Sequence, residues 1–247
     1  MTDLRILRFD ELESTNTEAI SQARRGAAEG LCVVARRQTA GRGRAGRRWI
    51  SEDGAGLYAS LVLRPGFESR HFPIVTLAAA VAVACSLGSE FGISCDIKWP
   101  NDVLAGKRKI SGILAETTET LSGTAVIVGI GVNLLASAVS SDISGIATSV
   151  ESETGSRPDQ DDLLGPLLRH FFFQYEKLST RAGRAEVLSE WATRSSFHKG
   201  KEVRVTLDSR VLEGVTDGID ENGSLIVRTG GGEAEVVQAG DVTSVRD

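Results

Sequence analysis

The segment from Pro73 to Leu87 constrains the fold most, because it is alanine-rich and apolar on nearly every side. A surface helix keeps one polar face, so a helix of this composition must be covered all round by other elements. We expect Gly88 to end it. The apolar stretch from Leu77 to Leu87 falls short of the roughly 20 residues that a membrane-spanning helix needs. The pattern predicts a core helix in a soluble domain without a membrane partner.

Strand and helix patterns surround this segment. Strands are predicted at 4–9, 31–35, 57–63, 94–99, 110–117 and 124–132, and further helices at about 15–25, 163–175 and 181–194. The first of these helices is expected to begin with a capping box formed by Thr15 and Glu18. Residues 137–159 have the composition of a loop with one short helix. Phe171, Phe172 and Tyr175 are expected to belong to the core stripe of the helix at 163–175, although an aromatic ligand platform over 171–173 is an alternative.

The pattern changes after Lys199-Gly200 to short alternating strands, which is typical of a small β-barrel. The strands are predicted at 202–207, 211–217, 224–228 and 234–238, with turns at Asp208-Ser209, Asn222-Gly223 and 230–232. A unit of about 50 residues has a marginal core, so it should pack against the larger part. We expect one domain over 1–197 and a second over 198–247.

Charge and cysteine usage exclude several classes of function. The net charge of −5 argues against general affinity for DNA or an anionic membrane, because both select for positive charge. Cys32, Cys85 and Cys95 are scattered, which fits a reducing compartment. The N-terminus has no apolar run of the kind found in signal peptides. The three histidines are far apart and lack partners at metal-ligand spacing. We expect a cytoplasmic protein without a protein-built metal site.

The loop GRGRAGRRW, Gly41 to Trp49, alternates glycine with arginine. Arginine forks bind phosphate or carboxylate oxygens in pairs, and glycines let backbone N–H groups approach the same anion. The loop therefore fits an anion site or, alternatively, a solvated basic loop. It is not a P-loop, because no Gly-Lys-Ser/Thr ends it, and Gly129-Ile130-Gly131 lacks the third glycine of a dinucleotide fingerprint.

The motif KWPND, residues 98–102, is expected to end a strand. Pro100 disfavours helical backbone at the residue before it, so Asn101 and Asp102 should project from the strand tip, where functional groups commonly lie. An ordinary Asn-Asp turn would explain the motif equally well.

Two later segments place charge or glycine in apolar strands. Lys109 begins the strand KISGILAE, so its ammonium could enter a cleft or could protect a sheet edge. Gly112 in that strand indicates close approach by a ligand or a neighbouring backbone. The glycines of GIGVNL, 129–134, could leave room for a flat ligand or could mark a bulge.

In their order along the chain, STNT at 14, RQTAGRGRAGRRW at 37, KWPNDV at 98, KISGILAE at 109 and GIGVNL at 129 closely resemble the biotin protein ligases. The resemblance covers almost the whole chain. It implies an α+β fold: a catalytic domain like those of class II aminoacyl-tRNA synthetases and biotinyl/lipoyl ligases, with a mixed sheet and flanking helices, plus a C-terminal SH3-like β-barrel.

The resemblance also implies the reaction. Biotin carboxylate would attack the α-phosphate of ATP, supplied with Mg²⁺, to give biotinoyl-5′-AMP and pyrophosphate. A lysine of a biotin carboxyl carrier protein or domain, such as that of acetyl-CoA carboxylase, would then take the biotin. Fixed cations suit both steps, because each concentrates negative charge.

Site residues follow from the same resemblance, position by position. The catalytic set would be Lys109, Arg44 and Asp102, with Asp102 orienting or deprotonating the acceptor amine. Binding of biotin or its adenylate would fall to Ser14, Thr15, Asn16, Gln38, Arg42, Gly43, Arg44, Trp49, Asn101, Lys109, Gly112, Gly129, Gly131 and Asn133. No protein ligand to a metal is implied. Ala45 stands where some family loops have arginine, which would weaken retention of the intermediate.

The chain begins at the catalytic region, so we expect no N-terminal DNA-binding domain and no DNA partner. A homodimer through an exposed sheet edge near 110–117 or 125–132 is possible on this pattern. Two other functions stay open at this point: a lipoate ligase, and a binding module that holds nucleic acid or an acidic peptide. The arginine loop and KWPND argue against the first, and the net charge argues against the second.

Overall fold

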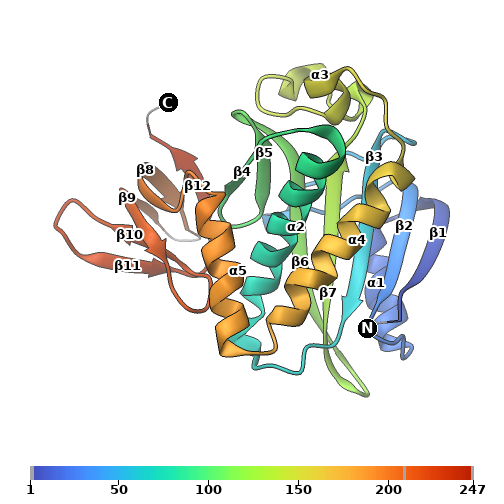
Figure 1. The fold of residues 1–247 in the computed structure, drawn as a ribbon, viewed down its shortest axis with the longest axis horizontal. Helices are drawn as coiled ribbons and strands as arrows, with labels where there is room; N and C mark the ends of the chain where they lie inside the picture. The colour runs from blue at the N-terminus through green and yellow to red at the C-terminus, as the bar shows by residue number, and fades with distance from the viewer. Residues whose placement is uncertain (1–2, 208–209, 246–247) are drawn as a thin grey trace.

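The computed structural model describes residues 3–207 and 210–245, which form two β-sheets with helices around the larger one (Figure 1). The strands of the larger sheet are β1 (Arg5–Leu12), β2 (Leu31–Gln38), β3 (Gly56–Leu63), β4 (Cys95–Lys98), β5 (Asp102–Ala105), β6 (Arg108–Thr120) and β7 (Gly123–Asn133). Their order in space is β1-β2-β3-β7-β6-β5-β4. The β1/β2 pair is parallel and the other pairs are antiparallel, so the sheet is mixed.

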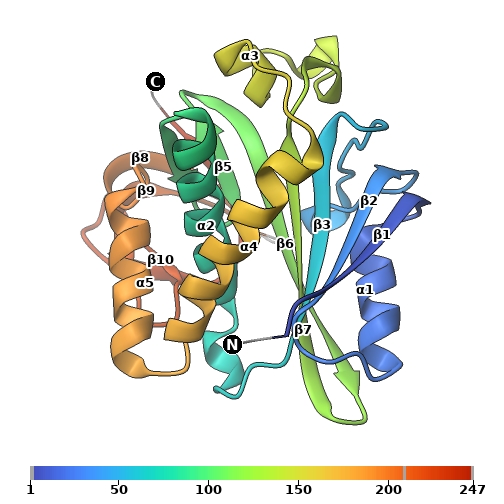
Figure 2. The ribbon, with the colours of Figure 1, turned by 45° about the vertical axis from the view of Figure 1, so that its right-hand side comes forward.

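Three helices cover one face of this sheet and a fourth lies on the other (Figures 1 and 2). The α-helices are α1 (Thr15–Arg24), α2 (Pro73–Phe91), α3 (Val150–Thr154), α4 (Gln160–Lys177) and α5 (Arg181–Thr193). Side chains alternate between the faces, so Leu57 and Leu61 pack into the large core with α2 and α4, whereas Val62 packs against Ala19 and Ala23 of α1. Because α1 is short, it covers only part of its face. The remainder is free to form a site.

Helix α2 is the predicted core helix, but it is longer than expected. It ends at Gly92, which adopts the left-handed conformation at φ 67°, and not at Gly88. With this extension, the segment Ser69–Phe91 is long and apolar enough to cross a membrane, contrary to the expectation from its apolar stretch. Two thirds of its most apolar window is buried, since α4, α5 and the sheet pack around it. Its composition therefore reflects burial in the core.

The start of α1 also differs from the prediction. Ser14 caps the helix, because its side chain accepts a hydrogen bond from the backbone N–H of Thr17. Glu18 is not part of a capping box and instead bonds Gln22 and Arg25. Thr15 is thereby left free for contacts beyond the helix.

The segment that follows β4 forms a hairpin that the sequence pattern did not predict. Trp99, Pro100 and Asn101 make its turn, and β5 returns from Asp102 to Ala105 before the turn at Gly106 and Lys107. A four-residue strand is too short to show an alternating pattern, which is why only the flanking strands were predicted. Asp102 is therefore the first residue of a strand and not the end of a loop.

Two other expectations concern the later helices. Residues 137–159 contain two 3₁₀ turns and the short helix α3, as the composition indicated. Phe171 and Phe172 of α4 are buried in the hydrophobic core, whereas Phe173 is exposed. Phe171 and Phe172 thus belong to the core stripe, as expected, and are not available as a ligand platform.

The predicted dimer edges are not equivalent in the structure. β7 is hydrogen-bonded to β3 on one side and β6 on the other, so residues 125–132 are not an edge. β6 pairs with β5 only as far as Gly112, and beyond it β6 has β7 as its neighbour in the sheet. The homodimer itself stays a prediction.

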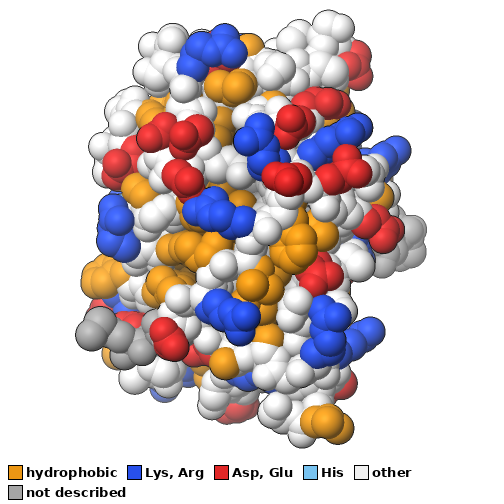
Figure 3. All heavy atoms as spheres, turned by 90° about the vertical axis from the view of Figure 1, so that its right-hand side faces the viewer, with side chains coloured by type: hydrophobic (Ala, Val, Ile, Leu, Met, Phe, Trp, Pro, Cys, Tyr) orange, Lys and Arg blue, Asp and Glu red, His pale blue; other side chains and the backbone are white. Residues whose placement is uncertain are grey.

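The outer strand β1 has the features of a protected edge. Figure 3 shows acidic and basic side chains interspersed on this side of the molecule, with hydrophobic atoms between them. Arg8 pairs with Asp161, and Glu11 pairs with Arg37 of β2. Charges along an edge strand disfavour pairing with another chain.

The second sheet is antiparallel and has five strands in the order β11-β10-β9-β8-β12. They are β8 (Lys199–Thr206), β9 (Val211–Ile219), β10 (Leu225–Arg228), β11 (Ala234–Val237) and β12 (Asp241–Ser244). The predicted turn at Asp208-Ser209 lies outside the described residues. The domain boundary at 197/198 stays a prediction, and it lies in the segment between α5 and β8.

Trp99 connects the two sheets. Its indole is 1% exposed, and its Nε1–H donates to the carbonyl of Gly223 at 3.0 Å, in the turn between β9 and β10. Gly223 has φ 83° and lies against Leu77 of α2. This contact fixes where the second sheet docks, next to the β4/β5 turn.

We expect Trp99→Phe to lower the free energy of unfolding by about 1–3 kcal/mol more than Trp191→Phe, because only Trp99 leaves a buried carbonyl without its donor. Trp191 is the matched control: its side chain is also fully buried, but its Nε1 has no hydrogen-bond partner among the described residues. Urea unfolding of both variants measures the difference. Equal losses would show that the Trp99 hydrogen bond contributes nothing.

Candidate functional site

A cleft of about 200 Å³ opens on the sheet face that α1 leaves uncovered. Its lining includes these residues singled out from the sequence: Ser14, Thr15, Asn16, Gln38, Arg42, Gly43, Arg44, Trp49, Asn101, Asp102, Lys109, Gly112, Gly129 and Gly131. Because Asp241, Val242 and Thr243 also line it, segments up to about 230 residues apart in the sequence meet at one place. The cleft is smaller than the roughly 300–1,000 Å³ of common ligand pockets. A nucleotide would therefore require the arginine loop over it to move.

Strand register aligns the floor of the cleft in a single row across five strands. Tyr58 of β3 lies opposite Gly131 of β7, Gly131 opposite Gly112 of β6, Gly112 opposite Asp102 of β5, and Asp102 opposite Lys98 of β4. All five residues line the cleft. Residues in register on one face lie side by side, so backbone pairing alone brings them together.

Lys109 reaches the same face through an irregularity in β6. The register with β5 shifts between Val103 and Leu104, so Leu104 pairs with Lys109 and not with Ile110. A bulge of this kind re-aims a side chain. Lys109 consequently lines the cleft and forms a 2.5 Å ion pair with Asp102, while Ile110 is buried in the core.

The backbone of Lys109 is held by the segment before α3. Its N–H donates to the carbonyl of Ile146 at 2.9 Å, and its carbonyl accepts from the N–H of Thr148 at 2.9 Å. The side chain of Asn133 donates to the carbonyl of Thr148 at 2.9 Å. Asn133 is buried and does not line the cleft in this structure, where it supports the segment that holds Lys109. Its contact with a ligand stays a prediction.

Other side chains of the protein fill the space over the glycines of the cleft floor. A Cβ on Gly131 would lie 2.5 Å from the ring of Trp49, and one on Gly112 would lie 2.8 Å from it. A Cβ on Gly129 would lie 2.1 Å from Oδ1 of Asn16. Trp49 and Asn16 therefore occupy the space over these glycines here, and room for a flat ligand there stays a prediction.

One end of the cleft offers neutral hydrogen-bonding groups. The backbone N–H and the hydroxyl of Thr15 both donate to Oε1 of Gln38, at 2.8 and 3.1 Å. Ser60, fully buried in β3, bonds the hydroxyl of Thr15 and Oδ1 of Asn16. These contacts fix the first turn of α1 against the sheet.

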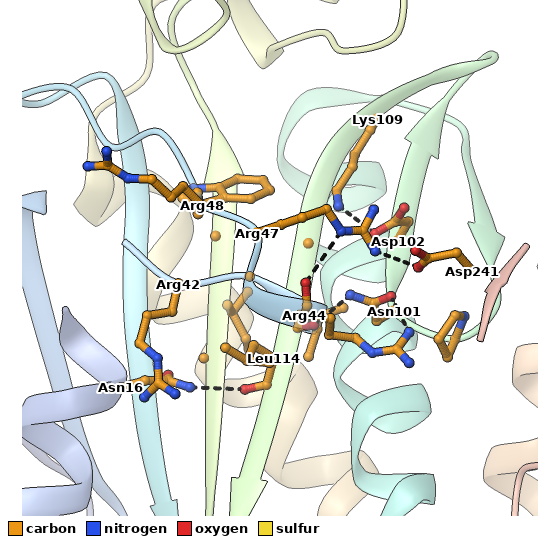
Figure 4. Close-up of a pocket in the computed structure, with 18 of the residues that line it drawn as sticks. Asn16, Arg42, Arg44, Arg47, Arg48, Asn101, Asp102, Lys109, Leu114 and Asp241 are labelled. Carbon is orange, nitrogen blue, oxygen red and sulfur yellow. Dashed lines mark hydrogen bonds and ion pairs between the residues drawn. The ribbon is translucent and has the colours of Figure 1, made fainter. Parts of the chain in front are cut away.

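Glu116 of β6 connects this end to the arginine loop. Its Oε2 accepts from Nδ2 of Asn16 at 2.8 Å, and its Oε1 pairs with Nη2 of Arg42 at 2.7 Å. Figure 4 shows Arg42 beside Asn16, at the opposite end of the cleft from Arg44 and Lys109. The two arginines expected to meet at one anion are thus apart in this structure.

The tip of the arginine loop is a tight reverse turn. The N–H of Arg47 donates to the carbonyl of Arg44 at 3.1 Å, and the two residues between them, Ala45 and Gly46, have φ 52° and 72°. Two central residues with positive φ define a type I′ turn. Glycine adopts this backbone freely, whereas the alanine costs about 1 kcal/mol. The effect of Ala45 on a bound intermediate stays a prediction.

The loop is attached to the second sheet at the start of β12. Nη2 of Arg47 pairs with Asp241 at 2.5 Å, and Nη1 of Arg44 donates to Asn101 at 3.2 Å and to the carbonyl of Gly240 at 3.5 Å (Figure 4). Burial lowers the pKa of Arg44, and the carboxylate of Asp241 opposes that shift. Cations of the arginine loop and the larger sheet therefore meet a carboxylate of the second sheet at this end.

Several residues around the cleft were not singled out from the sequence: Tyr58, Ser60, Lys98, Glu116 and Asp241. Two of them lie in β3, which is buried on both faces and so lacks the alternation that marks a functional face. Lys98 lies inside the KWPND motif, so the sequence already placed it beside two predicted site residues. Asp241 could not be found, since only the docking of the second sheet brings it here.

We expect Gly129→Ala to destabilise the protein by about 1–3 kcal/mol, because its Cβ would overlap the hydrogen-bonded amide of Asn16. Gly88→Ala is the matched control: Gly88 lies in α2, and the nearest atom to a Cβ there is 3.7 Å away. That variant should be neutral or more stable, since alanine favours a helix. Thermal unfolding compares them. A Gly129 variant as stable as the control would contradict the close packing.

Comparisons with known proteins agree with this arrangement. The family model "Biotin/lipoate A/B protein ligase family" matches residues 9–133, and "Biotin protein ligase C terminal domain" matches residues 198–243. The bifunctional ligase/repressor BirA of Bacillus subtilis is 35% identical over 95% of this chain and 72% of its own length. The biotin–[acetyl-CoA-carboxylase] ligase of Paracoccus denitrificans is 36% identical over 93% of this chain and 96% of its own.

A solved structure shares the fold. The biotin protein ligase of Aquifex aeolicus, in complex with biotin and ATP, superposes with a TM-score of 0.84 at 28% identity, over 98% of this chain and 99% of its own. The expected mixed-sheet catalytic fold with a small C-terminal β-domain is confirmed. By its sequence and its fold, the chain belongs to the biotin/lipoate A/B protein ligase family.

Proposed function

We propose that the chain is a biotin–protein ligase. It activates biotin with ATP to biotinoyl-5′-AMP and transfers the biotin to a lysine of a biotin carboxyl carrier protein or domain. The names of its relatives support both substrates, because they include biotin–[acetyl-CoA-carboxylase] ligases and a ligase solved with biotin and ATP.

The observation that carries the proposal is the division of the cleft into two ends. Neutral donors and acceptors from Ser14, Thr15, Asn16 and Gln38 lie at the α1 end. Lys98, Lys109 and Arg44 line the other end. Biotin has a neutral polar ring system and an anionic carboxylate on an apolar chain, and that carboxylate joins the α-phosphate in the adenylate. The order of groups in the ligand matches the order in the cleft.

In the first step, an oxygen of the biotin carboxylate attacks the α-phosphorus of ATP, and the bond to the bridging oxygen of pyrophosphate breaks. Lys109 and Arg44 stabilise the charge at the junction, with Arg42 and Gly43 completing the contact once the loop closes. Holding both reactants in one cleft supplies proximity. Trp49, Asn101, Gly112, Gly129 and Gly131 shape the pocket around the adenylate.

In the second step, the acceptor amine attacks the carbonyl carbon of the mixed anhydride, the C–O bond to AMP breaks, and the amine loses a proton. Asp102 is placed to orient that amine or accept its proton. Its carboxylate is 2.5 Å from the ammonium of Lys109, so a ligand phosphate that attracts Lys109 would free it for this role.

ATP enters as its Mg²⁺ complex in this proposal. Among the described residues, no group of three or more His, Cys, Asp or Glu could hold a metal ion. Mg²⁺ would therefore arrive on the phosphates of ATP. We further propose a boundary between the catalytic and C-terminal domains at 197/198, and a cytoplasmic location, which three free cysteines allow.

Incubation of the protein with MgATP and either biotin or lipoate tests the function. We expect pyrophosphate and an adenylate with biotin but not with lipoate, followed by labelling of one lysine on a carboxylase carrier domain. Mass spectrometry detects both products. Activation of lipoate alone would assign the chain to the other branch of its family, and no adenylate with either acid would refute the proposal.

We expect Lys109→Ala to reduce adenylate formation at least roughly 100-fold, because it removes a cation from the charge that develops at the α-phosphate. ATP–pyrophosphate exchange measures this step. Lys199→Ala is the control, since this exposed lysine lies on β8, pairs with Asp217 and does not line the cleft. Exchange at the rate of the control would contradict the role of Lys109.

A further inference from the structure

Lys98 has no role in the reaction as described so far, yet it lines the cleft. It is the last residue of β4 and pairs in register with Asp102, at the end of the row that crosses the floor. Strands lie about 4.8 Å apart, which puts the Cα of Lys98 about 10 Å from that of Gly112, across β5. Its Cα therefore lies beyond Gly112 along the row, on the side away from the α1 end.

The backbone on both sides of Lys98 is fixed. The N–H of Ile97 donates to the carbonyl of Arg194 at 2.9 Å, and its carbonyl accepts from the hydroxyl of Ser195 at 2.6 Å. Trp99 is held by Gly223 of the second sheet. Ile97 is buried in the core, so alternation turns Lys98 to the cleft face. The side chain starts from a preorganised position.

The carboxylates near Lys98 are already paired. Asp102 bonds Lys109, and Asp241 bonds Arg47. Within residues 3–207 and 210–245, the side chain of Lys98 forms no ion pair or hydrogen bond. Together with Arg44, this end of the cleft holds four cations and two carboxylates. It therefore carries surplus positive charge that an anion can neutralise.

Burial is the largest influence on Lys98 and lowers the pKa of its ammonium. The carboxylates of Asp102 and Asp241 raise that pKa, and the cations of Lys109 and Arg47 lower it. A half-buried lysine without its own counterion gains more from a bound anion than an exposed one, because water screens it less.

We propose that Lys98 binds the β- and γ-phosphates of ATP and stabilises pyrophosphate as it leaves. The proposal rests on the ligase function above. In-line attack puts the entering carboxylate and the leaving pyrophosphate on opposite sides of the α-phosphorus. With biotin at the α1 end and Lys109 at the junction, the leaving group points along the row toward Lys98. The electron pair of the broken P–O bond stays on pyrophosphate, whose growing charge the ammonium neutralises.

The test separates the two half-reactions in the full-length protein. Lys98→Ala should slow ATP–pyrophosphate exchange roughly 10- to 100-fold and raise the KM for ATP. Transfer from added biotinoyl-5′-AMP to the carrier domain should stay within about twofold of wild type, because that step involves no pyrophosphate. Lys98→Arg should restore part of the exchange, since it keeps the charge. Lys199→Ala is again the control.

Two results would overturn the assignment of Lys98. One is exchange in Lys98→Ala at the rate of the control, and the other is an equal loss in both half-reactions, which indicates a structural role. Affinity for inorganic pyrophosphate, measured by calorimetry, should fall at least about tenfold in Lys98→Ala, and an unchanged value also overturns it. A wild-type protein that forms no adenylate refutes the ligase function itself, so the two failures are distinguishable.

Discussion

Backbone pairing of β3, β7, β6, β5 and β4 is the interaction on which the rest of this site depends. Their register sets Tyr58, Gly131, Gly112, Asp102 and Lys98 in one row on one face of the sheet. Because α1 covers only part of that face, the row remains open as the floor of a cleft. One bulge in β6 then adds Lys109 to the cleft. Position within the sheet thus determines which charges can act together.

The two ends of the row differ in their charged groups. At the α1 end, uncharged groups bond one another, and Glu116 holds Arg42. At the β4 end, the cations outnumber the carboxylates, and those carboxylates come from both sheets. Docking of the small sheet through Trp99 therefore does more than bury apolar surface, because it also brings Asp241 to the arginine loop. The stability of that docking and the geometry of the loop are physically coupled.

Local sequence predicted much of this structure, and its errors have local causes. The core helix α2 and most strands were predicted because burial leaves a periodic or continuous apolar pattern. The end of α2 was misplaced, since a glycine can continue a helix and only a left-handed backbone shows which one stops it. β5 was missed because four residues show no period. The cap of α1 was assigned to Thr15, although Ser14 makes that contact and Thr15 contacts Gln38.

By itself, the sequence determined which chemical groups this protein has available. They are a loop of arginines and glycines, the lysine and aspartate of KWPND with a further lysine at 109, and strands that contain glycines. The tertiary structure alone decided how those groups are paired. Trp49 fills the space over Gly112 and Gly131, Asn133 supports a backbone and does not line the cleft, and the Lys98 side chain has no ion pair among the described residues. The reason is that pairing depends on register and on docking between distant segments, and a residue pattern along one segment carries no information about which segment will lie beside it.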